Sequence, residues 1–277
     1  MTNHRKIPDG VLFYCKNCGS KKIVIENYES KKDEAGYGNA YREHLDMTKF
    51  IQLIYLFEKN YSFVNYNLKL LDVGFGNGNF LLGLNKKGIK VTGLDCDIEA
   101  VDLIKRKGIE AYYGELGGEL MIEGKYDLIT LWDVLEHIDN IEKAMQQLTG
   151  LITETGRIFI ITPDANSIFD KLAGIERYFT FFRSQRIMSI CLNKYHLHRF
   201  SAKGLKILFE RYGFTVEHIE LIQLFSLKPE TYTDGFAPGI MKWTGSSAVN
   251  KIISKRAMNI IKMLNVRNKI LLTAVRE

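Results

Sequence analysis

Short apolar runs alternate with amphipathic segments between residues 68 and 161. Runs of this kind are typical of buried strands, whereas apolar residues every three or four positions are typical of helices. The alternation therefore predicts an α/β domain with a parallel sheet, helices on both faces and right-handed crossovers. The expected strands cover residues 68–73, 90–94, 110–113, 126–131 and 157–161, and the expected helices cover residues 79–87, 98–107 and 138–151.

The same pattern extends this domain in both directions. Apolar residues at roughly helical spacing predict a helix over residues 41–60. Later in the chain, Ser201 is a favourable N-cap for a helix over residues 201–212, and Gly213 stands where such a helix would end. Strands expected at 214–222 and 269–275 complete a doubly wound, mostly parallel, seven-stranded sheet.

Two segments stand apart from this pattern. Residues 1–40 read as an N-terminal extension, in which a strand-like stretch precedes a polar, turn-rich one. Residues 41–277 form the main domain, and residues 164–199 interrupt it with many aromatic and six basic side chains. We interpret this insertion as a lid, although an internally packed helical cap would have a similar composition.

The composition is that of an ordinary globular protein. The chain has 277 residues, 46% of them hydrophobic and 25% charged, with a net charge of +6. It contains no apolar run of about 18 residues and no apolar core of a secretory signal near residue 1. The 4 cysteines are too few and too scattered for a disulfide framework. We therefore expect a cytoplasmic protein.

A glycine-rich loop is the strongest chemical motif in the chain. Gly74, Gly76 and Gly78 follow a predicted buried strand and precede a predicted helix. Glycine lets the backbone N–H groups approach a ligand closely at the helix N-terminus. A dinucleotide fingerprint would need glycine at position 79, where Asn79 stands. The loop thus fits a nucleoside joined to methionine better than a pyrophosphate, which disfavours a NAD-dependent oxidoreductase.

Asp95 supports this interpretation. It lies at the end of the next predicted strand, 17 positions after Gly78. A carboxylate at this edge of a parallel sheet can accept hydrogen bonds from both hydroxyls of a ribose. An ordinary surface acid is the alternative, but the preceding glycine loop favours ribose binding.

With these motifs in place, the chain resembles the class I methyltransferases that use S-adenosylmethionine. Within that class it is similar to the small-molecule O-methyltransferases that include the ubiquinone-biosynthesis enzymes. The resemblance covers about residues 66–222. Besides the loop and Asp95, it rests on the sequence from Trp132 to Ile138, on residues 156–163, and on the sequence from His196 to Ser201.

The resemblance implies a Rossmann-like methyltransferase fold and S-adenosylmethionine as cofactor. It places Glu115 and Leu116 at the adenine amino group, although this family more often has aspartate at position 115. It also places Trp132 and Asp133 beside adenine and methionine. The cofactor-binding residues expected on this basis are Asp72, Gly74, Phe75, Gly76, Gly78, Asp95, Cys96, Glu115, Leu116, Trp132 and Asp133.

Methyl transfer to a hydroxyl group requires loss of its proton, and histidine is a natural base near neutral pH. Three histidines lie in the matched stretches, namely His137, His196 and His198. His196 lies at the end of the predicted lid, at the mouth of the expected pocket, so we expect it to be the base. It could instead hydrogen-bond the lid to the core. His137 follows the fourth strand and is expected to line the pocket or to be the base itself.

Cys15 and Cys18 have the spacing of one knuckle of a zinc ribbon. A structural zinc ion needs four ligands, and the chain has no second pair of this kind. We therefore expect no metal here and interpret the pair as a degenerate ribbon or a plain hairpin. Zinc shared between two copies of the chain is the alternative.

These observations favour methyl transfer to oxygen, or less readily to nitrogen, of a small-molecule acceptor. The basic, aromatic lid suits an acceptor with an anionic part, such as a sugar derivative, or a lipid head group at a membrane surface. An RNA methyltransferase and a non-catalytic cofactor-binding scaffold are the alternatives. No nucleic-acid partner is expected, because Leu131 to Val134 lack the Asn/Asp-Pro-Pro-Tyr/Phe motif of enzymes that methylate base amines. The sequence does not define the oligomeric state.

Overall fold

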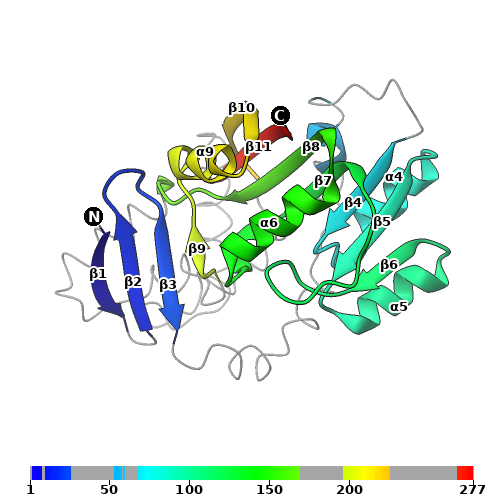
Figure 1. The fold of residues 1–277 in the computed structure, drawn as a ribbon, viewed down its shortest axis with the longest axis horizontal. Helices are drawn as coiled ribbons and strands as arrows, with labels where there is room; N and C mark the ends of the chain where they lie inside the picture. Colours follow the sequence, from blue (N-terminus) through cyan, green and yellow to red (C-terminus); the bar gives the residue numbers. More distant parts are fainter. Residues whose placement is uncertain are drawn as a thin grey trace, which may run out of the picture.

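A computed structural model describes residues 2–7, 10–25, 53–57, 59, 68–168, 196–224 and 267–276 (Figure 1). Most of the predicted lid, residues 169–195, lies outside the described residues, as do residues 26–52. The described end of the first predicted helix, residues 53–57, is helical. Phe57 is buried there. Tyr55, one of the apolar residues on which the helix prediction rested, is 63% exposed.

A seven-stranded sheet forms the centre of the molecule, with strand order β10-β11-β8-β7-β4-β5-β6. In this sheet β11 alone runs opposite to the other six strands, which confirms the predicted mostly parallel sheet. The strands are β4 (Lys69–Val73), β5 (Lys90–Asp95), β6 (Glu110–Tyr113), β7 (Tyr126–Trp132), β8 (Ile152–Pro163), β10 (Phe214–Ile222) and β11 (Lys269–Arg276).

Helices cover both faces of this sheet, as the doubly wound prediction requires. They are α4 (Asn79–Lys86), α5 (Ile98–Arg106), α6 (Ile141–Leu151) and α9 (Ala202–Arg211). Alternate residues of a strand enter opposite layers, because side chains of a strand point alternately to its two faces. In β8, for example, Ile158 and Ile160 pack with α6 and α9, whereas Phe159 and Ile161 pack with α4 and α5. None of the described helices has the length and apolar character that a membrane crossing requires.

The helix ends follow from local hydrogen bonds. Ser201 caps α9 as predicted, because its Oγ accepts a hydrogen bond from the Gly204 N–H at 2.9 Å. Gly213 follows α9 with φ of +77°. The helix predicted over residues 138–151 instead begins at Ile141, since the Asn140 side chain accepts from the Lys143 N–H.

The residues before Asn140 form a separate 3₁₀ turn, η1 (Leu135–His137). All three of its residues are buried. The turn follows β7 directly, and the His137 N–H donates to the Val134 carbonyl at 2.9 Å. It therefore fixes Glu136 and His137 at the carboxyl edge of the sheet, rather than on the first turn of a helix.

The N-terminal segment forms a second, smaller sheet at one end of the molecule (Figure 1). Its strands are β1 (Thr2–Ile7), β2 (Gly10–Cys15), β3 (Lys21–Ile25) and β9 (His198–Arg199), all paired antiparallel. The last strand comes from the end of the predicted lid, a pairing that the sequence pattern did not indicate. The N-terminal sheet thus bonds directly to the segment that carries His196 and His198.

Contacts at the start of α9 strengthen this junction. The Ser201 hydroxyl donates to the Cys18 carbonyl, and the Ser201 N–H donates to Ser20 Oγ at 3.1 Å. Gly204 leaves room for this approach, because a Cβ atom at this position would collide with Ser20 Oγ. The Cys15–Cys18 turn is therefore packed against the main domain.

Candidate functional site

The strand order places a topological switch between β4 and β7. After β4 the chain proceeds to β5 and β6 on one side of it, and then returns to β7 on the other side. Ligands of open α/β sheets bind at the carboxyl ends of the strands at such a point. The predicted cofactor residues all lie at or next to the carboxyl ends of β4, β5, β6 and β7, so the fold brings them to one edge.

The glycine loop leads from β4 into α4. Gly74, Gly76 and Gly78 have φ values of +67°, +57° and +72°, a region that L side chains rarely adopt. A Cβ atom on Gly74 would also collide with Val134, and one on Gly78 with Ile104. Gly78 caps α4 without any side-chain hydrogen bond, which leaves the helix N-terminus open to a polar ligand group.

Asp95 holds this loop in place. Its carboxylate accepts hydrogen bonds from the Gly76 N–H at 2.7 Å and from the Asp97 N–H at 2.9 Å. Burial raises the pKa of Asp95, whose residue is 8% exposed. A carboxylate can accept about four hydrogen bonds, so acceptor positions remain for a ribose. Next to it, Cys96 is exposed.

Asp72 lies beneath the loop, fully buried within β4. The Thr130 hydroxyl donates to its Oδ1 at 2.7 Å, and its Oδ2 has no hydrogen-bond partner among the described residues. Burial, with a smaller contribution from the nearby Asp95 carboxylate, raises the pKa of Asp72 to about 8. The protonated form of Asp72 is thus favoured in the folded protein.

This shift predicts a pH dependence of stability. The pKa of about 8 in the folded protein exceeds the ordinary 3.8, so folding takes up a proton in between. The stability from protonated Asp72 is complete below about pH 4 and falls by about 1.4 kcal/mol per pH unit up to about pH 8. Asp72→Asn keeps an acceptor for Thr130 and should remove this fall. Urea unfolding of both proteins between pH 5 and 8 measures it, and equal slopes would contradict the assignment.

The loop after β6 carries the residues expected at adenine. Glu115 is half-buried and Leu116 is buried in the core. The amide of Gln147, on α6, accepts from the Gly117 N–H at 2.7 Å and donates to the Gly118 carbonyl at 3.0 Å. Gln147 thus fixes the loop from α6. Sequence reasoning missed this role because the two segments are 30 positions apart.

Trp132 ends β7 and is 8% exposed. Its ring packs edge-on against Phe80 and Phe57, with centroid distances of 5.2 and 6.4 Å. The next residue, Asp133, has φ of +59°, the only non-glycine residue in the described part of the chain with a positive φ. Such strain persists where surrounding contacts hold the residue, and it is frequent at functional sites.

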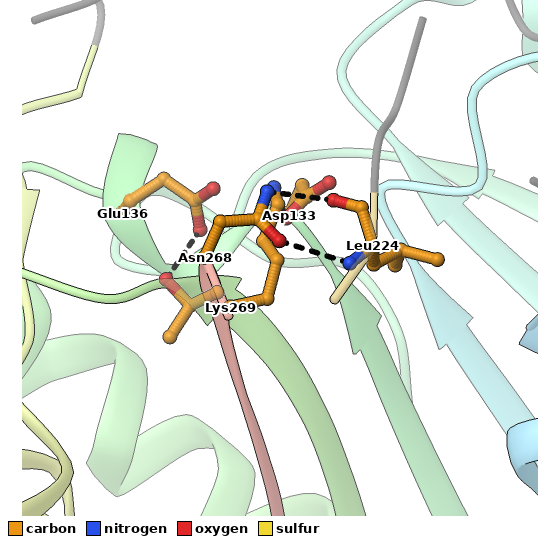
Figure 2. Close-up of polar contacts among 6 residues, drawn as sticks. Asp133, Glu136, Leu224, Asn268 and Lys269 are labelled. Atoms are coloured by element: carbon orange, nitrogen blue, oxygen red, sulfur yellow. Dashed lines mark hydrogen bonds and ion pairs between the residues drawn. The ribbon is translucent and has the colours of Figure 1, made fainter. Parts of the chain in front are cut away.

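An ion pair provides one of these contacts. Lys269 Nζ lies 2.5 Å from Asp133 Oδ1, and both side chains are buried (Figure 2). Lys269 is the first residue of β11, and because β11 is antiparallel, it lies at the same edge as the ends of the other strands. Sequence reasoning missed it. A lone charge at the start of an apolar strand was the available signal.

Asn268 joins three strands at this edge (Figure 2). Its amide donates to the Leu224 carbonyl at 2.8 Å and accepts from the Leu224 N–H at 2.9 Å. Its backbone bonds Ile222 and Asp164, which end β10 and follow β8. Asn268, also missed from the sequence, thereby fixes the position of the neighbouring Lys269.

The two predicted catalytic histidines lie together. The ring centroids of His137 and His196 are 4.7 Å apart with an interplanar angle of 75°. Glu136 joins them, and we call Glu136, His137 and His196 the histidine–glutamate cluster. One donor atom from each side chain lies within 4.8 Å of the others. Sequence reasoning noted Glu136 in the motif but gave it no role.

Burial dominates the electrostatics of this cluster. It raises the pKa of Glu136 to about 7, and the Thr162 hydroxyl donates to Glu136 Oε2 at 2.9 Å (Figure 2). Burial also lowers the pKa of His196 well below the ordinary value. His196 is therefore a neutral imidazole at neutral pH, with a lone pair on one nitrogen.

His198 lies outside the cluster. Its ring stacks on Phe200 with a centroid distance of 5.7 Å, and its Nε2 lies 3.4 Å from the Asp139 carbonyl oxygen. Burial lowers the pKa of His198 to about 4. Of the three histidines considered as bases, His198 is thus the one whose ring packs away from the cluster.

Cys15 and Cys18 are partly exposed free thiols at the end of β2 and in the following turn. Hydrogen bonds from Cys18 lower the pKa of the Cys15 thiol. In the part of the chain that the structure describes, they do not belong to a group of three or more metal-ligating side chains.

Comparison with known proteins agrees with this geometry. A family model for a methyltransferase domain matches residues 40–219. A ubiquinone biosynthesis O-methyltransferase of Rickettsia felis is 33% identical over 119 residues, 40% of this chain and 49% of the relative. One from Colwellia psychrerythraea is 30% identical over 104 residues, covering 35% and 42%. The chain thus matches about half the length of these curated relatives, or less.

Solved structures share the fold. Magnesium protoporphyrin IX methyltransferase from Synechocystis, with bound SAH, has a TM-score of 0.52 at 13% identity, covering 92% of this chain and 90% of that one. A SAM-dependent methyltransferase from Archaeoglobus fulgidus also gives 0.52, at 15% identity, covering 91% and 100%. The cyclase SpnF gives 0.54 at 15% identity, covering 81% and 80%.

The residues present fit S-adenosylmethionine. Three glycines in left-handed conformations, a helix N-terminus without a side-chain cap and the Asp95 carboxylate meet at the switch point between β4 and β7. These groups suit a ligand with a ribose and polar ends. Together with the match over residues 40–219, they show that the chain belongs to the methyltransferase domain family, with the fold of the class I S-adenosylmethionine-dependent methyltransferases.

Proposed function

We propose that this protein transfers a methyl group to an oxygen atom of a small-molecule acceptor. The observation that carries the proposal is the place of the histidine–glutamate cluster. The His137 N–H donates to the Val134 carbonyl, and Val134 packs on Gly74 of the cofactor loop closely enough that a Cβ atom on Gly74 would collide with it. A polar, buried cluster beside the donor loop is where an acceptor hydroxyl can be prepared for methylation.

Backbone groups of Gly74, Gly76 and Gly78 would hold the cofactor, with Asp95 at its ribose. When bound, S-adenosylmethionine supplies a methyl group attached to a good leaving group. The loop after β6 would receive adenine at Glu115, and Trp132 and Asp133 would complete the site. The chain's own task is then mainly to place the acceptor oxygen in line and to help remove its proton.

His196 and His137 are the residues that we propose to act on the acceptor hydroxyl. Oxygen is favoured over nitrogen because a neutral amine is nucleophilic without losing a proton first, and would not need such a cluster. The names of the curated relatives, which are O-methyltransferases, support the same choice.

The acceptor is proposed to carry an anionic part, such as a phosphorylated or nucleotide-linked sugar. The basic and aromatic composition of residues 164–199 supports this class. At the described end of that segment, Arg199 is 3% exposed, and its charge acts electrostatically on His196. A lipid head group at a membrane surface is the alternative acceptor, because it also carries an anionic part.

Methyl donor carrying label in its methyl group tests the proposal. The protein is incubated with separate pools of phenols and catechols, hydroxylated or phosphorylated sugars, amines and RNA. We expect label in the small-molecule fraction, and mass fragmentation of the product should place it on oxygen. Label in RNA, or on nitrogen only, would overturn the assignment.

Asp95→Ala tests whether label incorporation depends on the proposed cofactor site. It removes the carboxylate expected at the ribose, and stranding the Gly76 and Asp97 N–H groups should cost about 1–3 kcal/mol. Incorporation should fall with the affinity for S-adenosylhomocysteine. If the wild type binds that ligand and no pool accepts label, the protein binds the cofactor without transferring methyl groups. The cyclase SpnF shares this fold and is not named a methyltransferase.

A further inference from the structure

We infer that Glu136, His137 and His196 form a binding site for one divalent first-row cation of the zinc type. Binding of the cation depends only on these residues. Its role, which is to coordinate the acceptor oxygen, rests on the proposed function.

The donor atoms of the cluster converge. One carboxylate oxygen and two imidazole nitrogens lie within 4.8 Å of one another. The rings are nearly perpendicular, at 75°, so they do not stack face to face. Bonds of about 2.1 Å in a tetrahedral zinc site hold ligand atoms about 3.4 Å apart. Side-chain rotations that bring the atoms up to about 1.4 Å closer would therefore close the site.

Two polar atoms in the cluster are buried without hydrogen bonds. Glu136 is 1% exposed, and its Oε1 has no partner among the described residues. The same holds for His196 Nδ1 within the described part of the chain. A buried polar atom left unpaired costs about 1–3 kcal/mol, so two of them in one cluster call for a ligand. A cation would satisfy both atoms at once.

The supporting structure resembles that of a metal site. Thr162 fixes Glu136 by donating to its other carboxylate oxygen, Oε2, at 2.9 Å. Such outer contacts orient ligating side chains. His196 is held from the other side, because the Ile23 N–H of β3 donates to the carbonyl of the adjacent Leu197 at 2.7 Å. The ligands thus come from two elements that are fixed independently.

The charges around the cluster leave room for one bound cation. Lys269 and Arg199 both act electrostatically on His196. The ammonium of Lys269 is balanced by Asp133 in the buried ion pair. An ionised Glu136 then supplies one negative charge to the cation, and a deprotonated acceptor oxygen would supply another.

The donor set indicates the class of cation. Two imidazoles and one carboxylate suit Zn²⁺, Co²⁺, Mn²⁺ and Fe²⁺, whereas Mg²⁺ and Ca²⁺ prefer sites made of oxygen. Three protein ligands leave at least one position open. A bound hydroxyl there becomes more acidic, as water does on zinc. Its O–H bond then breaks with the electron pair left on oxygen and the proton passing to solvent, so the histidines serve as ligands.

The experiment uses the untagged full chain after treatment with a chelator. Cys15 and Cys18 are both changed to serine, because thiolates would compete for the probe. Titration with Co²⁺ is followed by visible absorption, and Zn²⁺ is then added as competitor. We expect about one equivalent of tightly bound Co²⁺ that Zn²⁺ displaces, with affinity at least about tenfold lower in His196→Ala and in Glu136→Gln.

His198→Ala is the matched control, since it also removes a buried imidazole, two residues from His196, but lies outside the cluster. It should bind Co²⁺ like the parent protein. Equal affinity in His196→Ala and the parent, or equal losses in His196→Ala and His198→Ala, would overturn the site. Absence of Co²⁺ binding by the parent would do the same.

Failure of the proposed function can be distinguished from failure of the cation site. Calorimetry with S-adenosylhomocysteine and the labelled-donor assay are run on the same samples. A protein that binds Co²⁺ at the cluster but labels no small molecule retains the cation site and loses the function. A protein that labels an acceptor at an unchanged rate after chelation retains the function and loses the cation's role.

Discussion

Gly76→Val should weaken the binding of S-adenosylhomocysteine by at least about 100-fold. Gly76 has φ of +57°, which costs a residue with a Cβ atom about 1–2 kcal/mol, and more when it is β-branched. The loop would relieve this strain by moving, and the Gly76 N–H would then lose its bond of 2.7 Å to Asp95. A hydrogen bond to a charged group contributes about 1.5–3 kcal/mol. Together these terms come to about 2.5–5 kcal/mol, and calorimetry measures the loss.

Gly88→Val is the matched control. Gly88 has φ of +82° and lies in the turn between α4 and β5, at the opposite edge of the sheet from the loop. A Cβ atom there would meet nothing within 4 Å, so valine introduces backbone strain without a clash. Urea unfolding should show a comparable loss of stability in both variants, with normal affinity in Gly88→Val. Normal affinity in a folded Gly76→Val would show that this glycine serves chain geometry alone.

The main sheet could be predicted from sequence because its pattern is local. Buried parallel strands read as continuous apolar runs, and β4 and β7 begin and end within one residue of the bounds expected from those runs. The predicted start of α6 was wrong by three residues, since apolar spacing alone does not reveal that Asn140 caps the helix.

The cofactor edge was predictable for a similar reason. The glycine loop and Asp95 follow strands directly, so position in the sequence determines position in the fold. The rest depends on contacts between distant segments. Lys269 reaches Asp133 across 136 positions, and no pattern in either segment indicates the pair. Likewise, β9 joins the N-terminal sheet through partners such as Lys21 and Arg199, far apart in the chain.

The histidine–glutamate cluster combines residues that local sequence identified with a contact between distant segments that it did not. Its histidines were identified one by one, because each lies in a matched motif. Their proximity depends on η1 meeting β9 and the residues just before it, which the sequence does not show. Glu136 received no role because a carboxylate beside a histidine is common on surfaces, and only its burial distinguishes it here.

His196→Ala should lower turnover by about 100-fold or more, the usual contribution of a positioned proton-transfer group. As a base or as a cation ligand, its imidazole acts on the acceptor hydroxyl, so either role predicts the loss. Affinity for S-adenosylhomocysteine should change little, because His196 contacts the His137 ring rather than the glycine loop or Asp95. Single-turnover rates with saturating donor, beside calorimetry, separate the two quantities. His137→Ala should behave in the same way.

His198→Ala decides whether such a loss belongs to the cluster. Its ring stacks on Phe200, and its Nε2 faces the Asp139 carbonyl, so its removal should reduce stability and leave turnover per folded molecule near normal. A low rate only in His198→Ala would move the base to that residue and keep the reaction class. If all three variants keep full rates, no histidine is needed, and proximity alone drives transfer to an acceptor that is already ionised.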